Sequence, residues 1–472
     1  MNEFCKMLKR VFLFAALSCL LTVCFAQNKP LPVLKTNKPS LDFRMDAGPY
    51  RTWTVIPEVK PDILDVPVTD KPVKVVFKSE TDSVTFMVTI GQVYNFIVLV
   101  NGKDSAYTQV KGQKFVKPAT FSKTYIKKKD KRTSVEIPAV YELVNIVYAL
   151  TPSGQQNENF VYTQSSYYTQ VRQWFDKFQN APIVACFDSA LKQDGYFSLK
   201  MDAYAFEFSK RGKITQSKTY DRVSWGNKNT LRPYIPQLQQ FARESGFALF
   251  FKEHQNIYQA QISCYRDSIN TADMVNWLRQ NFPTTTYNAF KIIFSPLVSW
   301  NQSANRFEDN GFKEAQAHVN FPYIQPNAKK EWSAEALNLI RGSIVFTEIN
   351  HSFINPELEK HFKDPNFEIA FTNLDVWLDK NKAAGSYYNP VSAFNEYMNW
   401  GLVSLYEMDR APKADLNKMI QATVRNMQNR SGFKKFDAFN TFLIDLYQNR
   451  PPNKTLADLY PQIITWFAQN KG

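Results

Sequence analysis

The chain has 472 residues, of which 44% are hydrophobic and 21% are charged, and its formal net charge is +14. This length is sufficient for two or three domains with buried cores. Because the basic residues are spread along the chain, we expect no nucleic-acid partner in spite of the positive charge. The five cysteines are too few for a disulfide scaffold, and only Cys186 and Cys264 follow the first 26 residues.

Residues 1–26 have the pattern of a secretory signal peptide. A basic segment precedes the apolar run from Val11 to Val23, and a polar segment begins at Gln27. A lipid anchor at Cys19 or Cys24 is less favoured, because a valine and not a small residue precedes Cys24. We therefore expect an exported protein, periplasmic or extracellular. After signal cleavage no apolar run approaches the roughly 18 residues of a membrane span, so no span is expected.

The N-terminal part of the mature chain is predicted to be rich in β-structure. Residues 27–72 contain many prolines, which favours an extended lead-in over a helix. A β-rich module is predicted over residues 73–150, because apolar residues alternate with lysines from Val73 to Phe77. Asn101-Gly102 is typical of a tight hairpin turn. We expect a sandwich-like module without chemistry of its own.

Residues 151–166 contain proline, glycine and a run of glutamine and asparagine, which predicts a linker. Beyond it, residues 167–472 are predicted to form a mainly helical domain with a small β-sheet, including a β insertion over residues 196–220. The overall fold class is therefore α+β. The predicted helices of the last part are Trp332–Ile340, Ile344–Asn355, Phe367–Leu378, Ser392–Tyr406, Leu416–Met427, Phe436–Tyr447 and Leu456–Phe467.

The most informative motif is Thr347-Glu348-Ile349-Asn350-His351. It matches the zinc-peptidase signature H-E-x-x-H except at its first position. In the intact signature, two histidines four residues apart lie on one helix face and bind the metal, while the glutamate activates the bound water. Thr347 replaces the first histidine, and a threonine hydroxyl is a poor zinc ligand. The motif therefore predicts a peptidase scaffold without establishing catalysis.

The residues around this motif resemble a known family. Phe346 to Pro356 is similar to the H-E-F-S-H-S-F-V-N-P signature of a secreted bacterial family of unknown function, domain-of-unknown-function family 4932, whose members are regarded as zincin-like metallopeptidases. The H-S-F-x-N-P half matches with isoleucine for valine. Phe294–Leu297 and Asn395–Tyr397 also resemble this family. The resemblance covers about residues 165–472 and implies a zincin-like fold.

The resemblance also implies roles for individual residues. His351 corresponds to the second histidine ligand of zinc, Glu348 to the general base, and Glu396 to the third ligand. Two arrangements would compensate for Thr347. Glu348 and His351, spaced i and i+3, would both bind the metal with Glu396. Alternatively, His318, which lies four residues after Glu314, would replace the missing histidine and leave Glu348 free to activate water.

Two functions follow as hypotheses. The first is a secreted zinc-dependent peptidase with a degenerate motif, acting on a peptide or protein. The second is an inactive protein with a peptidase fold that acts as a binding or scaffold protein outside the cell or in the cell envelope. An enzyme needs a metal and a water-activating base at one place, whereas a binder needs only the groove. Thr347 favours the binder, and the retention of Glu348, His351 and Glu396 favours the enzyme.

Overall fold

The computed structural model describes residues 30–37, 40–48, 50–55, 61–325 and 327–472. The predicted signal peptide lies outside these residues. The protein is α+β, as predicted, with an all-strand N-terminal part and a helix-rich remainder. The chain divides into two compact units between Val116 and Lys117. Among the helices that the structure describes, none combines the length and the apolar character that crossing a membrane requires.

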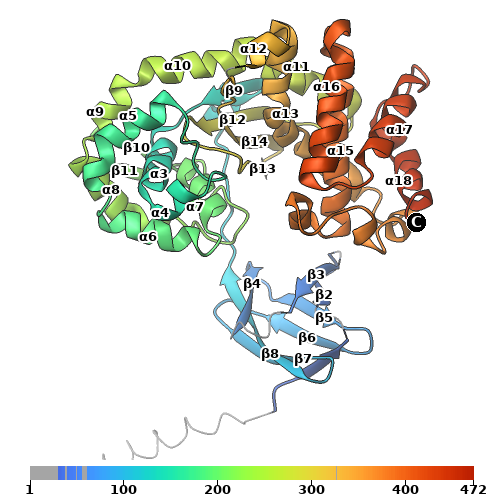
Figure 1. Cartoon of the computed structure of the whole chain (residues 1–472). Coiled ribbons are helices and arrows are strands. Elements are labelled where there is room, and N and C mark those ends of the chain that lie inside the picture. The colour runs from blue at the N-terminus through green and yellow to red at the C-terminus, as the bar shows by residue number, and fades with distance from the viewer. Residues whose placement is uncertain (1–29, 38–39, 49, 56–60, 326) are drawn as a thin grey trace, which may run out of the picture. The chain divides into compact units, whose positions relative to one another are not determined.

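The first unit is a β-sandwich of two four-stranded sheets, with strand orders β1-β7-β8-β4 and β3-β2-β5-β6 (Figure 1). One core lies between the sheets, where the rings of Phe77 and Phe96 are 4.9 Å apart. Asn101 and Gly102 both have positive φ, which confirms the predicted hairpin turn between β7 and β8. The strands are β1 (Val33–Thr36), β2 (Ser40–Met45), β3 (Arg51–Thr54), β4 (Asp62–Val68), β5 (Val73–Lys78), β6 (Ser83–Val88), β7 (Val93–Val100) and β8 (Asp104–Lys114).

The proline-rich residues 27–72 are not a separate lead-in, because their described part supplies β1 to β4. Leu34 and Val66 are buried in the sandwich core. Pro67 lies within β4, which is an edge strand of its sheet. Proline is tolerated at an edge because the missing N–H would have no partner strand there. The prolines therefore indicated an extended backbone correctly, while the pairing of that backbone into sheets was missed.

The predicted module boundary at residue 150 and the linker over residues 151–166 are wrong. The second unit already begins at Lys117, and α3 (Ala139–Leu150) lies in its core. Almost every residue of α3 is buried. A helix that is buried on nearly all sides shows little of the 3.6-residue alternation of apolar and polar residues that distinguishes a helix from a buried strand. The supposed linker contains α4 (Pro152–Gln156), which packs against α3 and α6 (Pro182–Leu191).

The sheet of the second unit has the order β13-β14-β12-β9, with β13 at one edge. β12 is fully buried and runs parallel to both β9 and β14, whereas β13 is antiparallel to β14. Asn310 and Gly311, both at positive φ, form the turn between β13 and β14. The bounds are Arg132–Glu136 for β9, Ala289–Ser295 for β12, Ser303–Asp309 for β13 and Phe312–Asn320 for β14.

Helices surround this sheet. The predicted β insertion over residues 196–220 is mainly wrong, because the segment begins with helix α7 and contains only a short hairpin, β10 (Phe206–Phe208) with β11 (Ile214–Gln216). The other helices are α2 (Lys123–Lys129), α5 (Ser166–Phe175), α7 (Tyr196–Asp202), α8 (Ile235–Glu244), α9 (Phe247–Glu253), α10 (Gln255–Ser263), α11 (Thr271–Asn281), α12 (Ala328–Glu331), α13 (Ala334–Glu359), α14 (Pro365–Ala370), α15 (Pro390–Arg410), α16 (Lys413–Arg425), α17 (Phe436–Gln448) and α18 (Tyr460–Gln469).

α13 carries the motif and is one continuous helix where two were predicted. It packs against β14, β13 and α15 (Figure 1). Pro356 lies inside the helix and has no N–H, so it leaves the carbonyl of Ser352 without its usual helical donor. The hydroxyl of Tyr287 donates to that carbonyl at 2.8 Å. This bond explains how the helix continues past a proline that would otherwise limit it.

The Tyr287 bond gives a double-mutant test. Tyr287→Phe removes the donor to the Ser352 carbonyl and should lower the free energy of unfolding by about 1 kcal/mol. Pro356→Ala restores a backbone N–H that can donate to the same carbonyl, so Tyr287→Phe should cost clearly less in that background. Urea unfolding followed by tryptophan fluorescence measures both costs, because every tryptophan except Trp53 lies in residues 117–472. Equal costs in the two backgrounds would contradict the role given to Tyr287.

Candidate functional site

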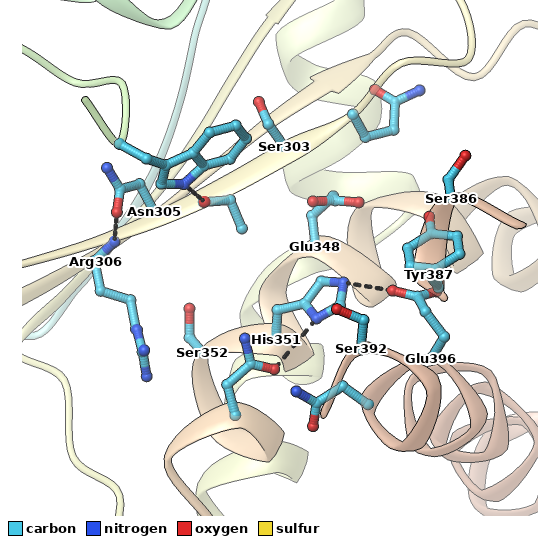
Figure 2. A pocket seen from close by; sticks show the side chains of 15 residues that line it. Ser303, Asn305, Arg306, Glu348, His351, Ser352, Ser386, Tyr387, Ser392 and Glu396 are labelled. Carbon is cyan, nitrogen blue, oxygen red and sulfur yellow. Dashed lines mark hydrogen bonds and ion pairs between the residues drawn. The ribbon is translucent and has the colours of Figure 1, made fainter. Parts of the chain in front are cut away.

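A cavity of about 720 Å³ lies beside the motif helix in the second unit. We call it the first pocket. Its walls come from β13, α13, the 3-10 helix η6 (Ala383–Tyr387) and α15. Figure 2 shows Glu348, His351 and Glu396 together on one side, with Asn305 and Arg306 of β13 on the other. The three residues that the sequence singled out therefore face one pocket.

The helical repeat of α13 determines which residues of the motif line this pocket. Glu348 lies three and four residues before His351 and Ser352, Asn355 lies four and three residues after them, and all four line the pocket. Thr347 is buried and does not line it. Its hydroxyl donates to the carbonyl of Ile344 at 2.7 Å, within its own helix. The residue that stands in place of the first histidine thus presents no donor atom to the pocket.

His351 is held by neighbours on both ring nitrogens. Its Nε2 lies 3.0 Å from Nδ2 of Asn399 and 3.4 Å from Oε1 of Glu396, both on α15. Its Nδ1 lies 3.5 Å from Oδ1 of Asn355. Because an amide N–H donates, the Asn399 contact makes Nε2 an acceptor and assigns the ring proton to Nδ1. The lone pair of Nε2 is therefore already engaged.

His318 does not join the first pocket, so its proposed replacement of the missing histidine is wrong for this structure. It is fully buried on β14 and contacts the ring of Tyr141 of α3 at 5.6 Å. Ile293 is its partner on β12, whereas Phe290 packs on Phe353 of α13. Since side chains alternate between the faces of a sheet, His318 points to the face opposite α13.

His318 and Glu314 do not pair directly either. Gln316 lies between them on the same face of β14, and its Nε2 donates to Glu314 Oε1 at 2.8 Å. Its Oε1 lies 3.2 Å from Nε2 of His318. Glu314 also accepts hydrogen bonds from the hydroxyls of Tyr125 and Tyr220. The sequence spacing identified residues on one face correctly, and the contacts assign them to a buried network.

Burial controls the charge of the first pocket. Desolvation, then the charge of Glu396, raises the pKa of Glu348 to about 8, although Lys200 opposes this rise. Desolvation raises the pKa of Glu396 to about 7 and lowers that of His351 to about 4. The charge of Glu396, followed by burial, raises the pKa of Tyr387. At neutral pH the pocket therefore holds a neutral imidazole, a mainly protonated Glu348 and a half-protonated Glu396.

The donor set supplies only part of a zinc site. Zinc bonds of about 2.0–2.1 Å at tetrahedral angles place two ligand atoms about 3.3 Å apart. The 3.4 Å between His351 Nε2 and Glu396 Oε1 fits that spacing. Yet within the described part of the chain, no three or more His, Cys, Asp or Glu side chains are grouped to hold a metal ion. With Thr347 turned into its helix and Asn399 on Nε2, these residues do not fit a three-ligand centre.

Sequence reasoning missed several residues of the site. Asn399 lies one helical turn after Glu396, yet an asparagine carries no signature of its own. Tyr387 and Tyr388 form an aromatic pair in the sequence, and such pairs are expected in a hydrophobic core more often than in a site. Ser303 and Arg306 line the pocket because β13 is an edge strand of the sheet. The order of strands in a sheet depends on tertiary pairing, which the local sequence does not show. The thiols of Cys186 and Cys264 are free and lie outside the pocket.

The fold and the site define an α+β protein whose second unit has a helix-lined pocket containing two carboxyl groups and one imidazole. The sequence matches no protein-family model, no curated protein and no solved structure. The zincin-like resemblance therefore stays a prediction.

The raised pKa of Glu348 predicts a pH dependence of stability. Between the ordinary glutamate pKa of about 4.3 and the folded value of about 8, the folded protein keeps a proton that the unfolded chain releases. Stability is therefore lost as the pH rises through this window. Glu348→Gln removes this contribution, so the wild type should lose up to about 1.4 kcal/mol more per pH unit than the variant.

Urea unfolding at pH 5, 6, 7 and 8, followed by tryptophan fluorescence, measures both slopes. Glu335→Gln is the control, because Glu335 is exposed in the first turn of the same helix. It should behave as the wild type does. Identical slopes for the wild type and Glu348→Gln would show that Glu348 is not buried as a neutral acid.

Proposed function

We propose that residues 117–472 form a peptide-binding domain on a zincin-like scaffold, and that the exported protein holds peptides in the first pocket without cleaving them. The observation that carries this proposal is the hydroxyl of Thr347, which bonds to Ile344 inside the helix and offers nothing to a metal. The amide of Asn399 on His351 Nε2 supports it further, because it engages the second would-be ligand. A catalytic zinc site needs three protein ligands, and these contacts leave the first pocket without that set. The pocket can still act as a groove for a ligand.

The edge strand β13 favours an extended peptide as the occupant. A strand at the edge of a sheet carries backbone N–H and C=O groups that no neighbouring strand satisfies, and an extended chain can pair with them. Residues 302–306 line the first pocket along this edge. The indole N–H of Trp225 donates to the carbonyl of Ala304 at 3.0 Å, and the N–H of Arg306 donates to Oδ1 of Asn305 at 2.8 Å. A bound peptide would therefore pair with the other groups of this edge, beside the exposed ring of Trp225.

The protonation of the pocket suits amide groups. A protonated Glu348 can donate to a peptide carbonyl, and an ionised Glu396 can accept from a peptide N–H. A neutral His351 adds no charge. Because a peptide backbone is uncharged, a pocket with little net charge loses less solvation energy on binding it than a fully ionised pocket would.

A peptide selection tests the proposal. The full mature protein is exposed to a library of acetylated and amidated octapeptides, and retained peptides are measured by fluorescence anisotropy with and without EDTA. We expect equal affinities in both conditions and recovery of intact peptides by mass spectrometry. Glu396→Ala should weaken binding at least about fivefold, the effect of losing roughly 1 kcal/mol of contact energy. Glu308→Ala, which removes an exposed carboxylate from β13 outside the first pocket, should change affinity less than about twofold.

Two outcomes would overturn the proposal. Failure to retain any peptide would exclude a peptide groove. Cleavage of the peptides that EDTA abolishes would favour a zinc-dependent peptidase, with His351 and Glu396 as ligands and Glu348 as base or substitute ligand.

A further inference from the structure

A second cavity, of about 350 Å³, lies in the same unit and is also lined by α13 and α15. We call it the second pocket. Its walls are mainly apolar, and their aromatic residues include Trp300 from the loop after β12, Trp332 before α13, Trp400 from α15, and the stacked pair Tyr162 and Tyr323. Trp300 is 51% exposed. Aromatic faces in such a wall attract apolar groups and cations.

Glu407 of α15 is the one buried carboxyl group among the described residues that line this pocket. It is 3% exposed, and its Oε2 atom has no hydrogen-bond partner among the described residues. A buried polar atom without a partner costs about 1–3 kcal/mol, so such atoms are rare unless a ligand satisfies them. Desolvation raises the pKa of Glu407 to about 8. The group is therefore a neutral acid at pH 7 while the pocket is empty.

Three cationic side chains lie in or beside the second pocket, and each has a partner other than Glu407. Arg341 of α13 donates from Nε to the carbonyl of Pro322 at 2.9 Å and from its terminal nitrogen to the sulfur of Cys264 at 3.0 Å. Arg430 is exposed and stands over the ring of Trp300 at 5.9 Å. Lys418 of α16 stands over Trp332 at 4.1 Å. No ion pair joins any of these three cations to Glu407 among the described residues.

We propose that the second pocket binds an ammonium group carried on an aromatic or apolar stem, with Glu407 as its counter-ion. The stem would lie between the tryptophan and tyrosine rings, and the ammonium would reach the unpartnered oxygen. Binding would ionise Glu407 and release its proton to solvent. This inference does not depend on the proposed function of the first pocket, because the two pockets share helices and no lining residue.

Three matched probes test the inference on the full mature protein by isothermal titration calorimetry. They are 2-phenylethylamine, 2-phenylethanol and phenylacetate, which differ mainly in the charge of the end group. We expect the amine to bind at least about tenfold more tightly than the alcohol. At pH 7, titrations in two buffers of different ionisation enthalpy should report the release of about one proton per bound amine. Tyr162, Tyr323, Arg341 and Arg430 are the other titratable groups that line the pocket, and Lys418 lies beside it over the ring of Trp332.

Glu407→Gln is the matched variant, because the amide keeps the shape of the side chain and cannot ionise. It should weaken the amine at least about tenfold, abolish proton release and leave the affinity for 2-phenylethanol unchanged. Unchanged alcohol binding shows that the variant is folded with an intact pocket. Glu335→Gln, an exposed change on α13 outside the pocket, should behave as wild type.

Other results would overturn the inference. If phenylacetate binds as tightly as the amine, the arginines and not Glu407 select the ligand. If the amine binds Glu407→Gln as tightly as the wild type, Glu407 is not its counter-ion. If none of the three probes binds at millimolar concentration, the second pocket does not recognise this class of ligand.

Discussion

The packing of α13 against α15 positions nearly every side chain that matters in the second unit. Two amide contacts join the helices at the first pocket, where Asn350 donates to the carbonyl of Asn399 at 3.1 Å and Asn399 lies on His351 Nε2. Farther along the same helices, Arg341 and Glu407 line the second pocket. Glycine assists one neighbouring contact, since a Cβ on Gly342 would meet Met274 of α11 at 2.5 Å. Helix packing therefore positions the carboxyl groups of both pockets, while β13, η6 and the loops that contain Trp225, Trp300 and Tyr323 supply other parts of their walls.

Both pockets contain carboxyl groups that burial keeps largely protonated near neutral pH. Glu348 has one buried cation whose charge stabilises its ionised form, Lys200, whose amine donates to the carbonyl of Asn301 at 2.7 Å. For Glu407, desolvation alone raises the pKa. Burying a carboxyl group without a cation lowers stability, and a site that binds a ligand can tolerate that cost because the ligand offsets it. The same physical condition thus applies to the proposed peptide groove and to the proposed pocket for an ammonium group.

The sequence predicted those features that local chemistry determines. The spacing of Glu348 and His351 on a helix predicted that these two residues share a face, whereas Glu396 was assigned to them only by the resemblance to the zincin-like family. The turn at Asn101-Gly102 was also predictable from its backbone requirement. The environment of Thr347 was not predictable from the sequence. A threonine hydroxyl on a helix can bond to a carbonyl of its own helix or point outward, and the sequence does not distinguish these two orientations.

The remaining errors came from tertiary packing. α3 is buried on nearly all sides and only Glu142 and Asn145 interrupt its apolar sequence, so its period gave little signal and the domain boundary was placed too late. His318 shares a spacing with Glu314 that also fits a helix, and only the strand register shows which face of the sheet it occupies. Asn399 and Glu407 were not predicted because only their surroundings give them a role. Asn399 contacts the imidazole of His351, and Oε2 of Glu407 lacks a hydrogen-bond partner among the described residues.

We propose that Thr347 deprives the first pocket of a third metal ligand, because its hydroxyl bonds within its own helix. The most direct test is zinc content by elemental mass spectrometry, after equilibration with zinc and mild dialysis, for wild type, His351→Ala, Thr347→Gln, Thr347→His, and Thr347→His combined with Asn399→Ala. We predict no bound zinc in the wild type or in His351→Ala, and about one equivalent only where Thr347→His is combined with Asn399→Ala, because the second change frees His351 Nε2. Thr347→Gln controls for the larger side chain. One equivalent in the wild type that His351→Ala loses would contradict the account and establish a metal centre without the first histidine.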